Sequence, residues 1–317
     1  MKLGVMIESQ EGVGWNEWKN IVQWTEELGF ESLWRSDHFF SFFGGSRNID
    51  SLDTMIAHTY TAAASSRIKF GPLVLSMTFR HPAVLARMAA AVDQLSGGRF
   101  ILGVGAGWNE VEHNAYGIEL PPVKQRMDNL EESVQVIKAL FENDSASYKG
   151  RIYSLNDAPM NPKPAASPIP LLIGGGGEKR TLRMVAKYAT EWNAPIMGGL
   201  DVFKQKSKVL EQHCEAVKRD PKTIDRSVMT GYIAGENQAE VDRKVQAAIE
   251  AAPARFRSPD SKRPPMTALW GTPPQIVEQI QELEDAGISR IMLQYRTPPA
   301  RSDLEFVARE LLPKVSV

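Results

Sequence analysis

The stretch Arg99-Phe-Ile-Leu-Gly-Val-Gly-Ala-Gly-Trp-Asn-Glu-Val-Glu-His-Asn-Ala-Tyr-Gly117 decides how the rest of the chain is interpreted. It starts as an apolar strand over 100–104, runs through glycines at 103, 105 and 107, and ends in a polar and aromatic segment. Glycines at the end of a strand let a flat ligand or an anion approach the backbone, because no Cβ stands in the way. The same pattern also fits a plain connection between a strand and a helix that needs positive φ.

Apolar strand candidates alternate with helices on both sides of this stretch. Strands are predicted at 3–7, 30–34, 68–75, 100–104, 171–173, 191–195, 227–234 and 290–294. Helices are predicted at 15–28, 53–65, 82–95, 126–141, 178–188, 203–217, 238–251, 275–286 and 304–312. This alternation indicates parallel βαβ units and, at 317 residues, an α/β protein with a single (β/α)8 TIM-barrel domain over 1–317. The alternative is a doubly wound open sheet, but the first strand is not followed by a G-x-G-x-x-G fingerprint.

Two stretches interrupt the alternation and are predicted to be loop insertions. The first, 144–168, contains Tyr148-Lys-Gly-Arg-Ile-Tyr153, which is typical of a small hairpin, followed by a proline-rich surface connection. The second, 253–265, is polar and rich in Arg and Pro, which predicts an excursion from the barrel.

The composition of the chain argues against some classes of binding partner. The formal net charge is −1, which argues against a nucleic-acid or membrane-surface partner. The single cysteine, Cys214, rules out an intramolecular disulfide framework and fits a reducing cytoplasm. The sequence contains no apolar stretch long enough to span a bilayer, and the first residues lead into a strand without the pattern of a secretory leader.

In a barrel of this kind the active site is built from loops at the C-terminal ends of the strands. Asp37 and His38 end the second strand, and a His there can donate a hydrogen bond or shuttle a proton near neutral pH. The alternative is that Asp37 caps the next turn beside an exposed His38. Gly174-Gly-Gly-Gly177 precedes a predicted helix, where free N–H groups and the helix dipole favour a phosphate. A plain glycine-rich turn is the alternative, and the missing Lys-Ser/Thr pair argues against a triphosphate.

The sequence lacks the residue patterns that several other kinds of enzyme chemistry require. The histidines show no H-x-H or H-E-x-x-H spacing, so no metal site is expected and a zinc hydrolase is disfavoured. No G-x-S-x-G elbow is present. A Schiff-base lysine would have to lie within a strand, and Lys69 stands at the wrong end of one.

The chain resembles the bacterial-luciferase-like flavin superfamily, and within it the branch of oxidoreductases that use the 5-deazaflavin coenzyme F420. Ordered motifs spread over nearly the whole chain carry this resemblance. They are Leu33-Trp-Arg-Ser-Asp-His38, Thr78-Phe-Arg-His-Pro82, Leu102-Gly-Val-Gly-Ala-Gly-Trp-Asn-Glu110 with Ala115-Tyr-Gly117, Ile173-Gly-Gly-Gly-Gly-Glu-Lys-Arg-Thr-Leu-Arg183, and Gly271-Thr-Pro with Asp285-Ala-Gly287.

The resemblance implies that a tricyclic ring lies in the barrel mouth, with a non-prolyl cis peptide bond at Leu73–Val74 against its back face. The resemblance also implies which residues of this chain are catalytic and which bind the cofactor. Those implied to be catalytic are Asp37, His38 and Trp108. Those implied to bind the cofactor are Asp37, Leu73, Val74, Gly105 and Asn109, with Gly175, Gly176 and Gly177 at its phosphate.

The chain departs from its sugar- and alcohol-oxidising relatives at two positions. Those relatives have a Trp four residues after the His and a Glu directly after the Gly-x-Gly-x-Gly run, whereas this chain has Phe42 and Trp108. Glucose 6-phosphate and simple alcohols are therefore not expected as substrates. His38 is then the expected proton donor, unless Asn109 or Glu110 turns inward to replace the missing acid.

The function implied is hydride transfer between C5 of F420 and a small organic substrate, in a protein that the family likeness suggests is a homodimer. The first alternative is an FMN-dependent luciferase-like monooxygenase, which shares the barrel and the phosphate loop. The second is a non-catalytic flavin-binding protein, which would not need the polar pair Asp37 and His38 beside the ring.

Overall fold

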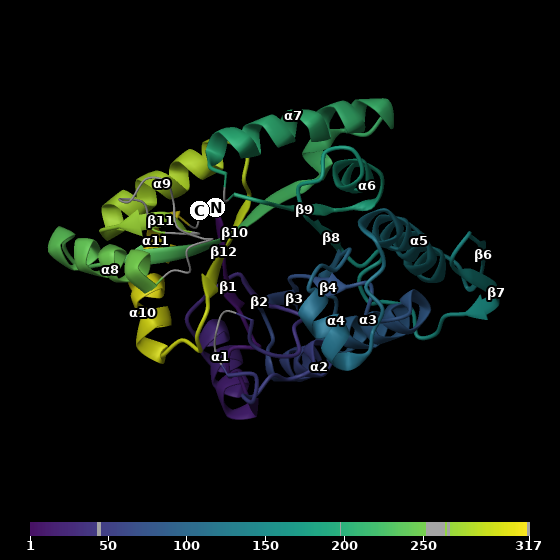
Figure 1. Cartoon of the computed structure of the whole chain (residues 1–317), viewed down its shortest axis with the longest axis horizontal. Coiled ribbons are helices and arrows are strands. Elements are labelled where there is room, and N and C mark those ends of the chain that lie inside the picture. The colour runs from purple at the N-terminus through teal and green to yellow at the C-terminus, as the bar shows by residue number, and fades with distance from the viewer. Residues whose placement is uncertain (43–45, 197, 252–263, 265–266, 316–317) are drawn as a thin grey trace.

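The structure is a computed structural model that describes residues 1–42, 46–196, 198–251, 264 and 267–315 (Figure 1). Parallel strands form the centre and helices lie around them. The strands are β1 (Lys2–Ile7), β2 (Ser32–Arg35), β3 (Lys69–Pro72), β4 (Leu75–Ser76), β5 (Leu102–Gly105), β6 (Ser145–Lys149), β7 (Ser154–Pro159), β8 (Leu171–Gly174), β9 (Glu191–Ala194), β10 (Asp225–Ala234), β11 (Thr267–Gly271) and β12 (Arg290–Tyr295). The helices are α1 (Trp15–Glu27), α2 (Thr54–Ala64), α3 (Pro82–Ser96), α4 (Glu110–Tyr116), α5 (Val123–Glu142), α6 (Thr181–Tyr188), α7 (Leu200–Ala216), the 3₁₀ turn η1 (Pro221–Thr223), α8 (Gln238–Ala251), α9 (Pro273–Asp285), α10 (Arg301–Glu310) and α11 (Leu312–Val315).

The main sheet closes into the predicted barrel. Its strands pair in the order β3-β2-β1-β12-β10-β9-β8-β5-β4, and β11 pairs with β10 off this path. Because β3 and β4 are consecutive pieces of one strand, the two ends of this order belong together. Phe70 of β3 also meets the chain just before β5, accepting a hydrogen bond from the Ile101 N–H at 2.9 Å. The expectation of a (β/α)8 barrel is therefore confirmed.

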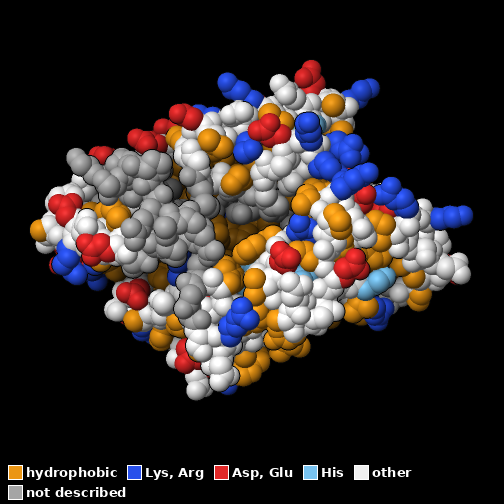
Figure 2. Space-filling model, viewed as in Figure 1, with side chains coloured by type: hydrophobic (Ala, Val, Ile, Leu, Met, Phe, Trp, Pro, Cys, Tyr) orange, Lys and Arg blue, Asp and Glu red, His pale blue; other side chains and the backbone are white. Residues whose placement is uncertain are grey.

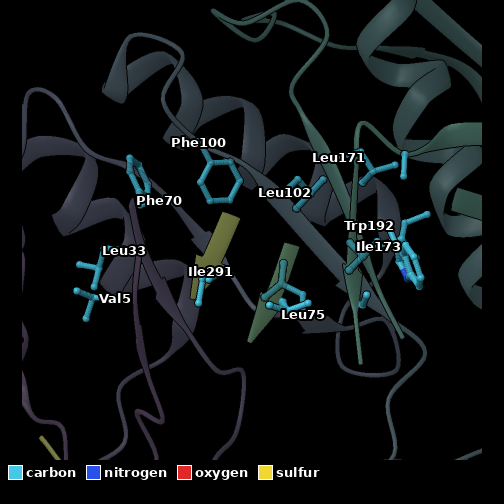
Figure 3. Close-up of a cluster of buried hydrophobic side chains, with 14 of the residues drawn as sticks. Val5, Leu33, Phe70, Leu75, Phe100, Leu102, Leu171, Ile173, Trp192 and Ile291 are labelled. Atoms are coloured by element: carbon cyan, nitrogen blue, oxygen red, sulfur yellow. The ribbon is translucent and has the colours of Figure 1, made fainter. Parts of the chain in front are cut away.

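The strands separate two apolar layers because successive side chains point to opposite faces. The outer layer packs between the strands and the helices, and Figure 3 shows part of it, with Val5, Leu33 and Ile291 among the labelled side chains. The inner layer fills the barrel. It consists of Met6, Trp34, Ile101, Leu172 and Met292.

Several predicted helix boundaries follow from capping residues. The Asp53 carboxylate accepts a hydrogen bond from the Ile56 N–H at 2.9 Å and so begins α2. Gly97, with φ 68°, ends α3 in the left-handed conformation that favours glycine. The predicted hairpin is also present, since β6 and β7 pair antiparallel and project beyond α5 (Figure 1).

Four local features differ from the predictions or were not predicted. The strand predicted at 68–75 is divided into β3 and β4, and α6 begins at Thr181 rather than at residue 178. Helix α4 was not predicted because it has only 7 residues. Strand β11 was not predicted either, since it is short and follows a proline-rich stretch. The excursion predicted at 253–265 lies outside the described residues apart from Pro264. Within the described ranges, every helix is too short or too polar to cross a membrane.

His58, a buried residue of α2, makes the free energy of unfolding depend on pH. It is fully buried beside Trp18, Phe70 and Phe100, with ring centroids 5.6 to 6.1 Å away. Burial, followed by the positive charge of Arg35, holds the pKa of His58 well below its ordinary value. The folded protein therefore keeps His58 neutral at a pH where the unfolded chain already binds a proton.

The free energy of unfolding should consequently fall as the pH drops below about 6.5, by up to about 1.4 kcal/mol per pH unit from this residue. Above that pH the residue should contribute no pH dependence. Urea unfolding at several pH values measures the effect, and His58→Phe, which suits the aromatic surroundings, should reduce the slope. An identical slope in the variant and the parent protein would show that His58 is not the source.

Candidate active site

A cavity of about 410 Å³ opens at the C-terminal ends of the barrel strands. Figure 2 shows this face of the molecule hollowed at its centre, with apolar side chains inside the hollow. The volume of the cavity lies within the range of about 300–1,000 Å³ that is usual for small-molecule sites. Strand alternation explains part of the lining. Met6 and Glu8 of the first strand and its extension point inward, as do Met229 and Gln294.

His38 and Glu112 form a close pair at one side of the cavity. His38 Nδ1 lies 2.7 Å from Glu112 Oε2, and the Phe39 N–H donates to Glu112 Oε1 at 2.6 Å. The Glu112 residue is fully buried on α4, so both hydrogen bonds are shielded from water. A carboxylate accepts hydrogen bonds, which places the proton of the imidazole on Nδ1. Nε2 is left as the nitrogen that can exchange a proton with a ligand.

Glu112 is the partner of His38 that sequence reasoning missed. The acid was sought at Asn109 or Glu110, but Glu110 is exposed and the Asn109 side chain caps α4. Glu112 and His113 are both buried in this short polar helix, but their burial is visible only in the structure and no local sequence pattern signalled it.

Asp37 is held by an ion pair rather than left free. Arg80 Nη1 and Nη2 donate to the two Asp37 oxygens at 2.7 and 3.0 Å, and the Ser76 N–H donates at 3.1 Å. Burial lowers the pKa of Arg80, but the charges of Asp37 and Asp53 outweigh it and leave that pKa above its ordinary value. Arg80 therefore stays charged and fixes the Asp37 carboxylate beside the cavity.

The break between β3 and β4 forms part of the cavity wall. The Leu73–Val74 peptide bond is cis, as the resemblance implied, and both side chains line the cavity. Neighbouring glycines make room for this segment. A Cβ at Gly103 would lie 2.0 Å from the Pro72 carbonyl oxygen, and one at Gly105 would lie 2.7 Å from Val74 Cγ2. Gly105 thus supports Val74, and its predicted contact with a cofactor stays a prediction.

The polar side chain of Asn109 has a fixed orientation in the cavity wall. Asn109 Oδ1 accepts from the Val111 N–H at 3.2 Å, which directs Nδ2 away from the helix. Within the described part of the chain, this buried Nδ2 has no hydrogen-bond partner. A buried donor without a partner costs about 1–3 kcal/mol, so an acceptor on a ligand would be stabilising here. Asn109 lines the cavity, as does Trp108.

The glycine loop begins next to the same wall. A Cβ at Gly174 would lie 3.2 Å from Val74 Cγ1, while Gly175 and Gly177 are exposed. Lys206 Nζ donates to the Gly176 carbonyl at 2.8 Å and lies 3.2 Å from a Glu178 oxygen. Lys and Arg side chains also gather over α5 and α6 on this face (Figure 2). The loop lies beside the 410 Å³ cavity rather than in its lining.

The predicted segments around 37 and 74 line one cavity at the end of the barrel, and the third predicted segment, around 176, begins beside the cavity wall at Gly174. Such a mouth, with a polar pair on one side and a glycine loop on the other, is typical of barrel enzymes that bind a cofactor with a phosphate. Among the residues the structure describes, no cluster of three or more His, Cys, Asp or Glu side chains could hold a metal ion.

The chain belongs to the luciferase-like monooxygenase family, whose model matches residues 1–290. It is 33% identical to an F420-dependent glucose-6-phosphate dehydrogenase of Amycolatopsis mediterranei, over 74% of this chain and 67% of the relative. It is 26% identical to an FMNH(2)-dependent dimethylsulfone monooxygenase of Pseudomonas putida, over 94% and 87% of the two chains. A solved F420-dependent secondary alcohol dehydrogenase, in complex with an F420-acetone adduct, has the same fold, with a TM-score of 0.83, 20% identity and coverage of 100% and 99%.

Proposed function

We propose that this protein is an F420-dependent oxidoreductase that transfers a hydride between C5 of the deazaflavin and a small organic substrate. The observation that carries the proposal is the meeting of the His38–Glu112 pair with the Leu73–Val74 wall in one cavity. The relative with 33% identity, which is named as F420-dependent, supports the choice of coenzyme.

The residues present fit such a coenzyme. Leu73 and Val74 offer an apolar surface for the back of a flat ring, and Asn109 Nδ2 offers a donor to its polar edge. The backbone at Gly175, Gly176 and Gly177, of which Gly175 and Gly177 are exposed, would hold the phosphate. When bound, the deazaflavin supplies two-electron hydride chemistry. The protein supplies binding, orientation and a proton.

His38 is the proposed proton donor and acceptor. Glu112 fixes the imidazole through Nδ1, so Nε2 holds or releases the proton that accompanies hydride transfer. Phe42 and Trp108 pack against the ring of His38, with centroids at 4.6 and 5.6 Å, and limit the access of water to it. Asp37, fixed by Arg80, is assigned to cofactor binding and to positioning its neighbour His38.

An FMN-dependent monooxygenase is the second candidate, because one relative named above uses FMNH(2). Titration of the apo-protein with F420 and with FMN in separate cells distinguishes the two. We expect F420 to bind at least tenfold more tightly than FMN. Tight binding of FMN with no binding of F420 would contradict the proposal and favour the monooxygenase.

Two substitutions on α7 test in the same titration whether the glycine loop binds the phosphate. Lys206→Ala removes the amine that holds the Gly176 carbonyl and a cation beside the loop, so the affinity for F420 should fall about tenfold. Lys208→Ala removes an exposed cation from the same helix and should change the affinity less than twofold. Equal effects of the two substitutions would show that the loop does not bind the phosphate.

Two further properties are proposed on narrower grounds. Cys214 is buried and unpaired, which supports a reducing compartment such as the cytoplasm. The family likeness supports a homodimer, which light scattering of the purified protein measures directly.

A further inference from the structure

We propose that the substrate is a neutral molecule with a flat, mostly apolar body, and that it is not a phosphorylated sugar. This inference rests on the proposed function, because it assigns the substrate to the same cavity. It departs from the activity named for the relative with 33% identity, a glucose-6-phosphate dehydrogenase.

The first argument is the aromatic wall around His38. Trp108 is 61% exposed at the cavity, and its ring lies 5.3 Å from Phe42 at an interplanar angle of 87°. Phe79 lines the same cavity. A large exposed aromatic side chain at a cavity is typical of a surface on which a flat apolar ligand packs.

The second argument is the charge balance. The acidic side chains at the cavity already have partners, because Asp37 is paired with Arg80 and Glu112 with His38. Glu8 lines the cavity and accepts hydrogen bonds from the side-chain amides of Gln10 and Gln294, and its charge also acts on the partly buried guanidinium of Arg296.

Within the described part of the chain, no lysine or arginine lines the cavity. A phosphate dianion would therefore enter among three carboxylates without a cation directed toward it. Burying such a charge without a partner is strongly unfavourable. A neutral substrate avoids this cost.

The expected reaction for such a substrate is reduction of a conjugated double bond or an aryl ketone. The substrate gains a hydride at carbon and a proton, from His38 Nε2, at the adjacent carbon or oxygen. One double bond is lost, the substrate gains two electrons, and the reduced coenzyme loses two.

Isothermal titration calorimetry of the protein saturated with oxidised F420 tests this inference by ligand binding, since the oxidised coenzyme has no hydride to give to a ketone. The probes are 1-indanone, a flat neutral aromatic ketone, and glucose 6-phosphate. We expect 1-indanone to bind at least 100-fold more tightly. Trp108→Ala should weaken that binding at least tenfold, whereas Val111→Ala, which removes an exposed apolar side chain of α4 outside the cavity lining, should change it less than twofold.

Equal or tighter binding of glucose 6-phosphate would overturn the inference, as would unchanged binding of 1-indanone to the Trp108→Ala protein. Neither result would contradict the proposed function, because F420 is bound to the protein in every titration. Failure of F420 itself to bind would instead remove the proposed function.

Discussion

Replacing His38 with alanine should reduce the rate of hydride transfer by about 10²- to 10⁴-fold, which is the usual contribution of a positioned acid or base. The affinity for F420 should change less than threefold, because His38 contacts the reacting end of the cavity rather than the glycine loop. Single-turnover oxidation of reduced F420 by 1-indanone measures the rate, and titration measures the affinity. A rate within threefold of the parent protein would contradict the role of His38 and favour a non-catalytic flavin-binding protein.

Glu112→Gln tests how His38 is held, since the amide can no longer accept two hydrogen bonds in the geometry of the carboxylate. The rate should fall at least tenfold. Glu110→Gln is the matched control, because Glu110 lies exposed on the same helix and should have no effect. The ¹⁵N spectrum of the His38 ring gives a readout independent of turnover. The Nδ1–H form should dominate in the parent protein and lose that dominance in Glu112→Gln.

Replacing Gly103 with alanine should lower the free energy of unfolding by about 3 kcal/mol or more. The added Cβ would lie 2.0 Å from the Pro72 carbonyl oxygen, and backbone cannot move aside as a flexible side chain can. The segment displaced would be the one that carries Leu73 and Val74, so the affinity for F420 should fall as well. Urea unfolding followed by circular dichroism measures the stability.

Gly29→Ala is a milder substitution whose loss of stability is compared with that of Gly103→Ala. Gly29 has φ 86° and nothing within 4 Å of an added Cβ, so only the left-handed backbone opposes the change, at about 1–2 kcal/mol. A Gly103→Ala protein as stable as the parent, or no less stable than Gly29→Ala, would show that the contact between β5 and the cavity wall is not tight.

The sequence allowed the barrel to be predicted because the strand and helix periods are local properties of the chain. Strands such as 3–7 and caps such as Asp53 follow from residues close to one another. The division of 68–75 into β3 and β4 did not follow from periodicity. It was expected only at Leu73–Val74, through family likeness, and the structure confirms the cis bond there.

The partners of the site residues could not be predicted, because they come from distant parts of the chain. Glu112 meets His38 across 74 residues, and Arg80 meets Asp37 across 43. No local pattern indicates which of several acidic residues on a short helix faces the barrel. The glycines show the same limit, since Gly103 and Gly105 were associated with a ligand but directly accommodate Pro72 and Val74.

A crystal structure of the protein with F420 examines the arrangement at the cavity most directly. The deazaflavin ring should lie against Leu73 and Val74 with its C5 facing the side that carries His38, and the phosphate should contact the backbone at 175–177. A ring bound outside the 410 Å³ cavity, or a phosphate distant from the glycine loop, would contradict the proposed function.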